Sequence, residues 1–91
     1  MSRRVYAGRK AIEPGSMEHE HILLLAELSR INSQRVISAL DDHLAGGMSR
    51  KEACEKNEVA QGYFSIILRK VLETHEIVKS IIRYYNSDRN V

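Results

Sequence analysis

The stretch from Ser49 to Val71 constrains the fold of this chain most, because two helices with clear start signals follow each other there across a short turn. Ser49 stands three residues before Glu52, the spacing of a capping box in which each side chain bonds the other residue's backbone amide. Four apolar residues then recur at the spacing of a helix that buries one face: Phe64, Ile67, Leu68 and Val71. This pattern predicts a helix-turn-helix, a unit that places one helix on DNA; a plain helical hairpin inside a small domain is the alternative.

The turn of this unit departs from the commonest pattern, in which a glycine ends the first helix and an apolar residue follows at once. Here Asn57 is followed by Glu58 before the apolar Val59. Because asparagine tolerates the left-handed conformation, we expect the first helix to end at Asn57 and the turn to cover residues 57–60. The extra residue either lengthens the first helix or changes the angle between the two helices.

Small, polar and basic residues lie opposite the apolar stripe of the second helix, counted at about 100° per residue. Glycine and serine permit close approach to a groove, and arginine and lysine neutralise phosphates. Together with the basic first turn of the preceding helix, they form the predicted DNA-binding surface: Arg50, Lys51, Gln61, Gly62, Ser65, Arg69 and Lys70. Ile66 is also expected to point outward, toward thymine methyl groups or toward another protomer.

A chain of 91 residues has room for one core, so a single domain is expected. With one Phe and no Trp, aliphatic side chains must fill that core, and dimerisation would add to its stability. The formal net charge is only +2, but the first ten residues carry four basic groups and no acidic group. A solvated polar surface explains this uneven charge as well as nucleic acid does.

Cys54 is the only cysteine, which excludes an intramolecular disulfide and fits a reducing cytoplasm. No run approaches the roughly 18 apolar residues of a membrane span, so we expect a soluble, cytosolic protein without a membrane partner. No pattern typical of an enzyme, a cofactor or a small-molecule site is present. Residues 18–21 read Glu-His-Glu-His, but neighbours on a helix point about 100° apart, so no metal site is expected. His43 and His75 are expected at the surface or at helix ends.

The expected fold is all-α, a small single-domain bundle of four to five helices that contains the helix-turn-helix. Residues 1–17 are expected to form a flexible basic arm, residues 18–85 the helical DNA-binding domain with the helix-turn-helix at 49–72, and residues 86–91 a frayed end. Within the domain, one helix is expected over about residues 18–31, the most buried of all. A second follows from the cap at Ser33 to the paired glycines 46–47. Thr74 caps a separate last helix, unless that helix is fused with the one before it.

The last helix carries an apolar stripe. The earlier helices can close a core of this size without it. The simpler expectation is that the stripe packs over the first helix within the monomer, and the alternative is a seam with a second subunit. The candidate oligomer contacts are therefore Ile66, Ile77, Ile81 and Tyr85.

Four sequence blocks follow one another along the chain: PGSM at residues 14–17, RINSQRVISAL at 30–40, GGMSRKEACEKN at 46–57 and GYFS at 62–65. The order of these blocks closely resembles the PapB family of fimbrial operon regulators. The match covers roughly residues 14–72, and its specificity lies in GG-x-SRKE-x-C-EK followed by GYFS, which a generic helix-turn-helix does not reproduce.

The resemblance implies a small, all-helical bacterial transcription regulator that controls adhesive fimbriae, binds A·T-rich repeated elements and assembles as oligomers along them. DNA contact in that family is associated with the minor groove, and the Arg and Cys of the SRKE-x-C block fall on Arg50 and Cys54. Tyr63 of the GYFS block therefore joins the predicted DNA-binding residues. Cys54 either joins them or, as a small apolar residue, only packs beneath that surface and shapes it. An arginine in the first turn of a helix suits the negative potential of a narrow A·T minor groove. Docking of the second helix in the major groove stays open as the other mode.

The leading hypothesis is a DNA-binding transcription regulator of a bacterial fimbrial or adhesin operon. It binds double-stranded, A·T-rich DNA as a homodimer or larger homo-oligomer and is associated with the nucleoid when bound. The second hypothesis is a protein-interaction adaptor whose exposed Ile66 and last-helix stripe bind a recombinase or another regulator without reading DNA.

Overall fold

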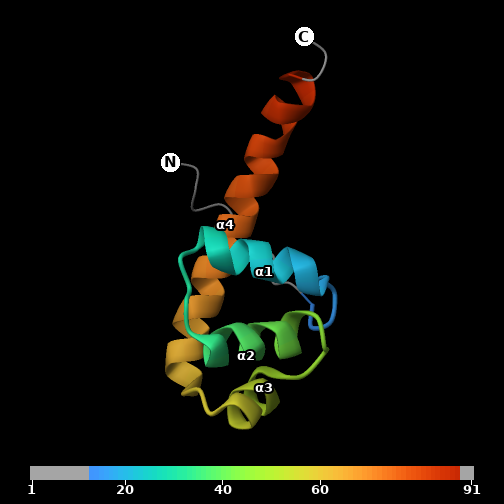
Figure 1. Ribbon diagram of the computed structural model, residues 1–91. Coiled ribbons are helices and arrows are strands. Elements are labelled where there is room, and N and C mark those ends of the chain that lie inside the picture. The colour runs from blue at the N-terminus through green and yellow to red at the C-terminus, as the bar shows by residue number, and fades with distance from the viewer. Residues whose placement is uncertain (1–12, 89–91) are drawn as a thin grey trace.

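The computed structural model describes residues 13–88, which form four helices and no strand. The helices are α1 (His19–Leu28), α2 (Gln34–Leu44), α3 (Arg50–Asn57) and α4 (Gln61–Asp88). α1 and α2 lie across one side of α4, α3 closes the end beyond α2, and α4 runs past the other three (Figure 1). The predicted fold class, a small all-α domain of four to five helices, is confirmed.

The core lies between the helices and consists of aliphatic side chains around one phenylalanine. Phe64 and Val71 of α4 are fully buried, as are Ile22 of α1 and Leu40 of α2. Leu68 keeps only 4% of its surface exposed, so the stripe predicted for the second helix of the pair is confirmed.

α1 is shorter and less buried than the sequence predicted. It ends at Leu28, because Arg30 takes a left-handed conformation with φ 61° and the Ile31 amide donates back to the Ala26 carbonyl oxygen at 2.9 Å. Leu24 and Leu28 are 57% and 58% exposed, so the prediction that this helix is the most buried was wrong.

α2 begins and ends where its signals predict. The Ser33 hydroxyl accepts a hydrogen bond from the Val36 amide at 3.3 Å, which caps the first turn. After Leu44 the chain turns through Gly46, where an added Cβ would lie 2.8 Å from the Asp42 carbonyl oxygen. A side chain has no room there, so this glycine is needed for the close return of the chain to α2.

The folded part of the chain begins before Glu18. The Gly15 amide donates to the His43 carbonyl oxygen at 3.1 Å and the Met17 amide to that of Leu44 at 2.9 Å, and Met17 is buried in the core. Residues 13–17, expected as the end of a flexible arm, are thus held on the end of α2. Residues 1–12 of the expected arm lie outside the described residues.

The last two expected helices are one. α4 is continuous through Thr74, whose hydroxyl donates to the Lys70 carbonyl oxygen at 3.0 Å and accepts at 3.1 Å from Ser29, the residue after α1, instead of capping a new helix. At 28 residues α4 is about 42 Å long, and the molecule measures 48 Å along its long axis against 27 and 22 Å across. The C-terminal half of α4 therefore projects from the globule (Figure 1).

Residues 86–88, expected to fray, are part of α4, and residues 89–91 lie outside the described residues. Over the described range, no helix combines the length and the apolar character that crossing a membrane requires.

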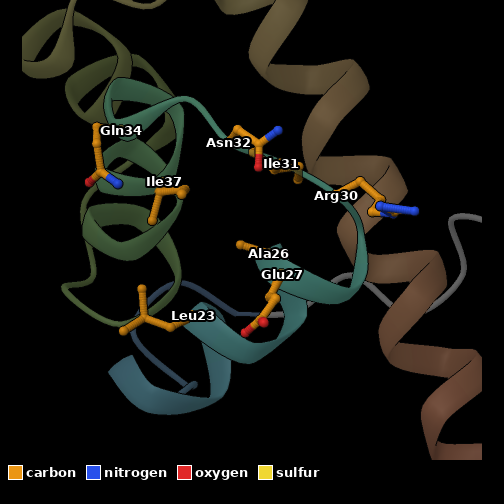
Figure 2. A pocket seen from close by; sticks show the side chains of 8 residues that line it. All are labelled: Leu23, Ala26, Glu27, Arg30, Ile31, Asn32, Gln34 and Ile37. Atoms are coloured by element: carbon orange, nitrogen blue, oxygen red, sulfur yellow. The ribbon is translucent and has the colours of Figure 1, made fainter.

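An open cavity lies between α1, the connection that follows it and α2 (Figure 2). The apolar side chains of Leu23 and Ile37 line it together with the charged side chains of Glu27 and Arg30. All of its lining residues fall within residues 23–37, so the cavity is separate from the helix pair α3 and α4.

Candidate nucleic-acid interface

The first turn of α3 presents two basic side chains to solvent. The Ser49 hydroxyl accepts from the Glu52 amide at 3.1 Å, and the Glu52 carboxylate accepts from the Ser49 amide at 3.2 Å, so the predicted capping box is confirmed. It fixes the helix start immediately before Arg50 and Lys51, which are both exposed. Because a helix N-terminus carries partial positive charge, this turn is suited to a phosphate.

The turn between α3 and α4 differs from the sequence prediction. Asn57 is the last helical residue, and the left-handed conformation falls on Glu58, with φ 56° and ψ 49°. The extra residue has therefore lengthened α3. The Asn57 side-chain amide instead donates to the Asp42 carboxylate at 2.9 Å and the Ala53 carbonyl oxygen at 2.8 Å, which ties the end of α3 to α2.

The start of α4 exposes most of the residues predicted to face DNA. Tyr63 and Ile66 keep 54% and 66% of their surface exposed. Gly62 has open space at the position of a Cβ, so packing does not require a glycine there. The other exposed members of the predicted set on this helix are Gln61, Arg69 and Lys70.

Arg50 and Ser65 join α3 to the outer side of α4. The Arg50 Nη1 donates to the Ser65 hydroxyl oxygen at 3.3 Å, and Ser65 is half-buried by this contact and its neighbours. The structure therefore brings together two predicted residues that lie 15 positions apart in the sequence. We use the name α3–α4 face for this pair together with the exposed basic residues beside it in sequence on the two helices: Arg50, Lys51, Ser65, Arg69 and Lys70.

Cys54 lies beneath this face and is only 2% exposed. Its burial raises the pKa of the thiol, while the charge of Arg50, one turn earlier on α3, acts to lower that pKa. The thiol cannot touch DNA while α3 stays in place, so of the two roles expected for Cys54 the burial favours packing over direct contact. Cys54 packs the helix that carries Arg50.

His43 lies in the last turn of α2, so the predicted helix-end position is confirmed, but its side chain is buried and not at the surface. It is 6% exposed, its Nδ1 lies 2.7 Å from the Met48 carbonyl oxygen, and its ring contacts Phe64 edge-on with centroids 6.0 Å apart. Because a carbonyl oxygen only accepts, Nδ1 must carry the hydrogen. The sequence held a signal for this position, since His43 follows Val36 by seven residues and so falls on the buried side of α2.

The histidines of residues 18–21 face different helices, as their helical spacing predicts. His19 Nδ1 lies 2.8 Å from an Asp41 carboxylate oxygen, whereas the His21 ring contacts that of His75 on α4, with centroids 5.2 Å apart. His75 is half-buried, so its predicted surface position was also wrong. Burial lowers the pKa of His75, and the nearby charges of His21 and Lys79 lower it further.

The apolar stripe of α4 does not pack over α1 beyond Val78, which is partly buried against the core. Ile77 is 50% exposed, Ile81 40% and Tyr85 66%. The expectation that the stripe packs over the first helix was therefore wrong for these side chains. Two further large side chains on the same half of α4 are exposed as well, Ile82 and Tyr84.

The fold and the α3–α4 face define a class of protein, a small all-α domain in which a basic helix start lies beside a polar helix face. The sequence matches the PapB family, described as adhesin biosynthesis transcription regulatory protein, over residues 2–85. The chain belongs to this family of transcription regulators. The resemblance predicted from the sequence blocks is confirmed.

Individual relatives agree with this assignment. Over 75 residues the chain is 43% identical to the major pilus subunit operon regulatory protein PapB of Escherichia coli, which covers 82% of this chain and 72% of PapB. The F1845 adhesin operon regulatory protein of Escherichia coli is 37% identical over 71 residues, covering 78% of this chain and 84% of that protein. The crystal structure of E. coli FocB matches with a TM-score of 0.82 at 37% identity, over 92% of this chain and 96% of FocB.

Proposed function

We propose that this regulator binds A·T-rich, double-stranded DNA at repeated sites of a fimbrial or adhesin operon, on the nucleoid of a bacterial cytoplasm. The observation that carries the proposal is the α3–α4 face, where Arg50 at the start of α3 reaches the outer side of α4. The names of the relatives, regulatory proteins of pilus and adhesin operons, support the choice of operon.

The charges of the α3–α4 face are available to phosphates. In residues 13–88 the ion pairs are His19–Asp41, Lys56–Asp42 and Lys79–Glu76, and none of them uses a cation of this face. A cation without a carboxylate partner loses no ion pair when it binds a phosphate. Four such cations are exposed here: Arg50, Lys51, Arg69 and Lys70.

We assign Arg50 to the minor groove and the lysines to the phosphate backbone. A narrow A·T minor groove has an enhanced negative potential that attracts an arginine, whereas phosphate contacts carry no sequence information. A small ligand that occupies A·T minor grooves should therefore displace the protein. Replacing adenine by 7-deaza-adenine removes a hydrogen-bond acceptor of the major groove only and should leave binding unchanged. If the minor-groove ligand fails to displace the protein and 7-deaza-adenine weakens binding, α4 would lie in the major groove.

The phosphate contacts are tested by the salt dependence of binding. For Lys51→Ala and for Lys70→Ala, affinity should fall on A·T-repeat and G·C duplexes alike, and the slope of log K against log salt should become shallower by about one. Lys79→Ala is the matched control, since this exposed lysine lies on the projecting half of α4 and pairs with Glu76. If Lys79→Ala changes the salt slope as much as Lys51→Ala does, the assignment of the phosphate contacts to the α3–α4 face would be refuted.

We also propose that the regulator binds as a dimer or larger oligomer through the C-terminal half of α4. Within residues 13–88 the isoleucines and tyrosines of this half are left exposed, and a stripe of this kind on a projecting helix is typical of a subunit contact. Several protomers on one DNA would raise the weak affinity expected from a net charge of +2.

The same exposed side chains favour a second function, an adaptor that binds another protein without reading DNA. Ile66, at 66% exposure, and the stripe of α4 would then be the contact residues. Titration of labelled A·T-repeat and scrambled duplexes at fixed salt separates the two functions. Equal affinity for both duplexes, together with a stable complex with a recombinase or another regulator, would favour the adaptor.

A further inference from the structure

The Arg50 side chain spans two helices. Its backbone belongs to the first turn of α3, and its Nη1 donates to the Ser65 hydroxyl of α4 at 3.3 Å. Within residues 13–88, Ser65 is the hydrogen-bond partner that the structure provides for this guanidinium. The contact crosses the joint between the two helices and is not a bond within either.

Apart from its hydrogen bond to Ser65, no ion pair within residues 13–88 holds the Arg50 side chain in place. Below it, one turn along α3, the buried Cys54 offers packing but no charge. Arg69 lies one turn beyond Ser65 on α4. Because like charges repel, Arg69 does not attract the Arg50 side chain to that helix. An exposed arginine has large rotamer freedom, which it loses on entering a narrow groove.

We propose that Ser65 is a positioning residue, whose hydroxyl holds the Arg50 guanidinium in the orientation that reads A·T-rich DNA. This inference rests on the proposed function and adds the group that sets its specificity. The bond uses one donor of the guanidinium and leaves the others for the groove. Because the orientation exists before DNA binds, less rotamer freedom is lost on binding.

Ser65 could alternatively touch DNA itself, or only hold α3 against α4. A double-mutant cycle separates these roles, because a residue that acts through Arg50 has no effect once Arg50 is gone. The proteins are the full chain and its Ser65→Ala, Arg50→Ala and doubly substituted forms, with Ser65→Thr as the variant that keeps the hydroxyl. Ser80→Ala is the matched control, because the Ser80 hydroxyl on the same helix bonds only the Glu76 carbonyl oxygen.

The measurement is the ratio of affinities for an A·T-repeat and a G·C duplex of equal length at fixed salt, with thermal unfolding of each protein recorded alongside. Ser65→Ala should lower the ratio by about threefold to tenfold, the effect of one net hydrogen bond, without changing the salt slope. Ser65→Thr should restore the ratio, Ser80→Ala should leave it unchanged, and Ser65→Ala should add nothing to Arg50→Ala.

Three results would overturn the proposal. An unchanged ratio in Ser65→Ala would show that the hydroxyl sets no preference, and a loss that persists in the Arg50→Ala background would show a direct contact with DNA. A loss that Ser65→Thr fails to restore, accompanied by a lower melting temperature, would show a packing role. If the unsubstituted protein itself has no A·T preference, the proposed function fails first and this inference fails with it.

Discussion

His75 lies where α4 leaves the core, and its Nδ1 is buried without a hydrogen-bond partner in the described part of the chain. A proton on this ring would be poorly solvated and would face the ring of His21 and the ammonium group of Lys79, with only the Glu76 carboxylate in its favour. The folded protein therefore keeps His75 neutral over a wider pH range than an exposed histidine.

This environment predicts a loss of stability in mild acid. Because the pKa of His75 is lowered from its ordinary value of 6.5, the unfolded chain takes up the proton first as the pH falls through that value. The free energy of unfolding should decrease from there until the pH passes the lower pKa of the folded protein, and it should be unaffected by this group well above pH 6.5. Denaturant unfolding between neutral pH and pH 5 measures the effect.

His75→Leu is the variant that isolates this group, because it keeps an apolar side chain against His21 and cannot take up a proton. Its stability should fall less steeply with acid than that of the unsubstituted protein. Equally steep curves for the two proteins would assign the acid sensitivity to another group.

The turn between α3 and α4 contains a residue in an unfavourable backbone conformation. Glu58 sits in the left-handed region at φ 56°, where any side chain beyond glycine costs about 1–2 kcal/mol. Its amide still donates to the Glu55 carbonyl oxygen at 3.3 Å, so the conformation closes the helix in the usual way. The helix pair therefore folds at some cost in this turn.

Glu58→Gly should stabilise the domain by roughly 0.5–1 kcal/mol, which would raise the melting temperature by about 3–6 °C in a chain of this size. The gain is smaller than the strain it relieves, because glycine also gives the unfolded chain more freedom. Glu55→Gly, in the middle of the same helix, is the control and should destabilise the protein by a similar amount. A lower melting temperature for Glu58→Gly would contradict the account of this turn.

Local signals predicted the helix pair well. The capping box at Ser49 and the stripe from Phe64 to Val71 depend on spacing within one helix, and the structure has both. The conformation of Glu58 was missed because asparagine is the better left-handed residue on its own, but Asn57 is engaged by Asp42 of another helix. Tertiary contacts outweighed the local preference there.

The same distinction applies to the candidate site. The spacing of apolar residues along α4 predicted which of its side chains are exposed. The Arg50–Ser65 hydrogen bond instead depends on the angle between two helices, which no pattern within one helix determines. The burial of Cys54, in contrast, agrees with the packing role that its small apolar side chain suggested, although α3 has almost no apolar stripe beyond this cysteine and one buried alanine. Single-helix patterns therefore predicted which residues are exposed, but not which of them meet.

The most unusual feature of the molecule is the projecting half of α4, because its apolar side chains stay exposed within residues 13–88. Five large apolar side chains on this half are exposed, at 40–66% of their surface: Ile77, Ile81, Ile82, Tyr84 and Tyr85. Burying a single isoleucine side chain is worth about 1.5–3 kcal/mol, so pairing two such helices would gain a substantial free energy.

Ile81→Glu should therefore weaken self-association strongly while the monomer stays folded. The glutamate is exposed in the monomer but would be buried in a dimer without a partner. Sedimentation velocity gives the oligomeric state, and circular dichroism checks the helix content. Lys79→Glu adds the same acid on the other side of α4 and should leave self-association intact; equal dissociation in both variants would argue against the stripe as the contact.

We propose that this regulator reads A·T-rich DNA through the α3–α4 face, and footprinting on the DNA upstream of its own operon is the sharpest test of that claim. We predict several regularly spaced protected A·T tracts, which extend as protein is added and disappear in Arg50→Ala while Lys79→Ala retains them. Protection spread evenly over A·T and G·C sequence, or a footprint that Arg50→Ala leaves unchanged, would contradict the claim.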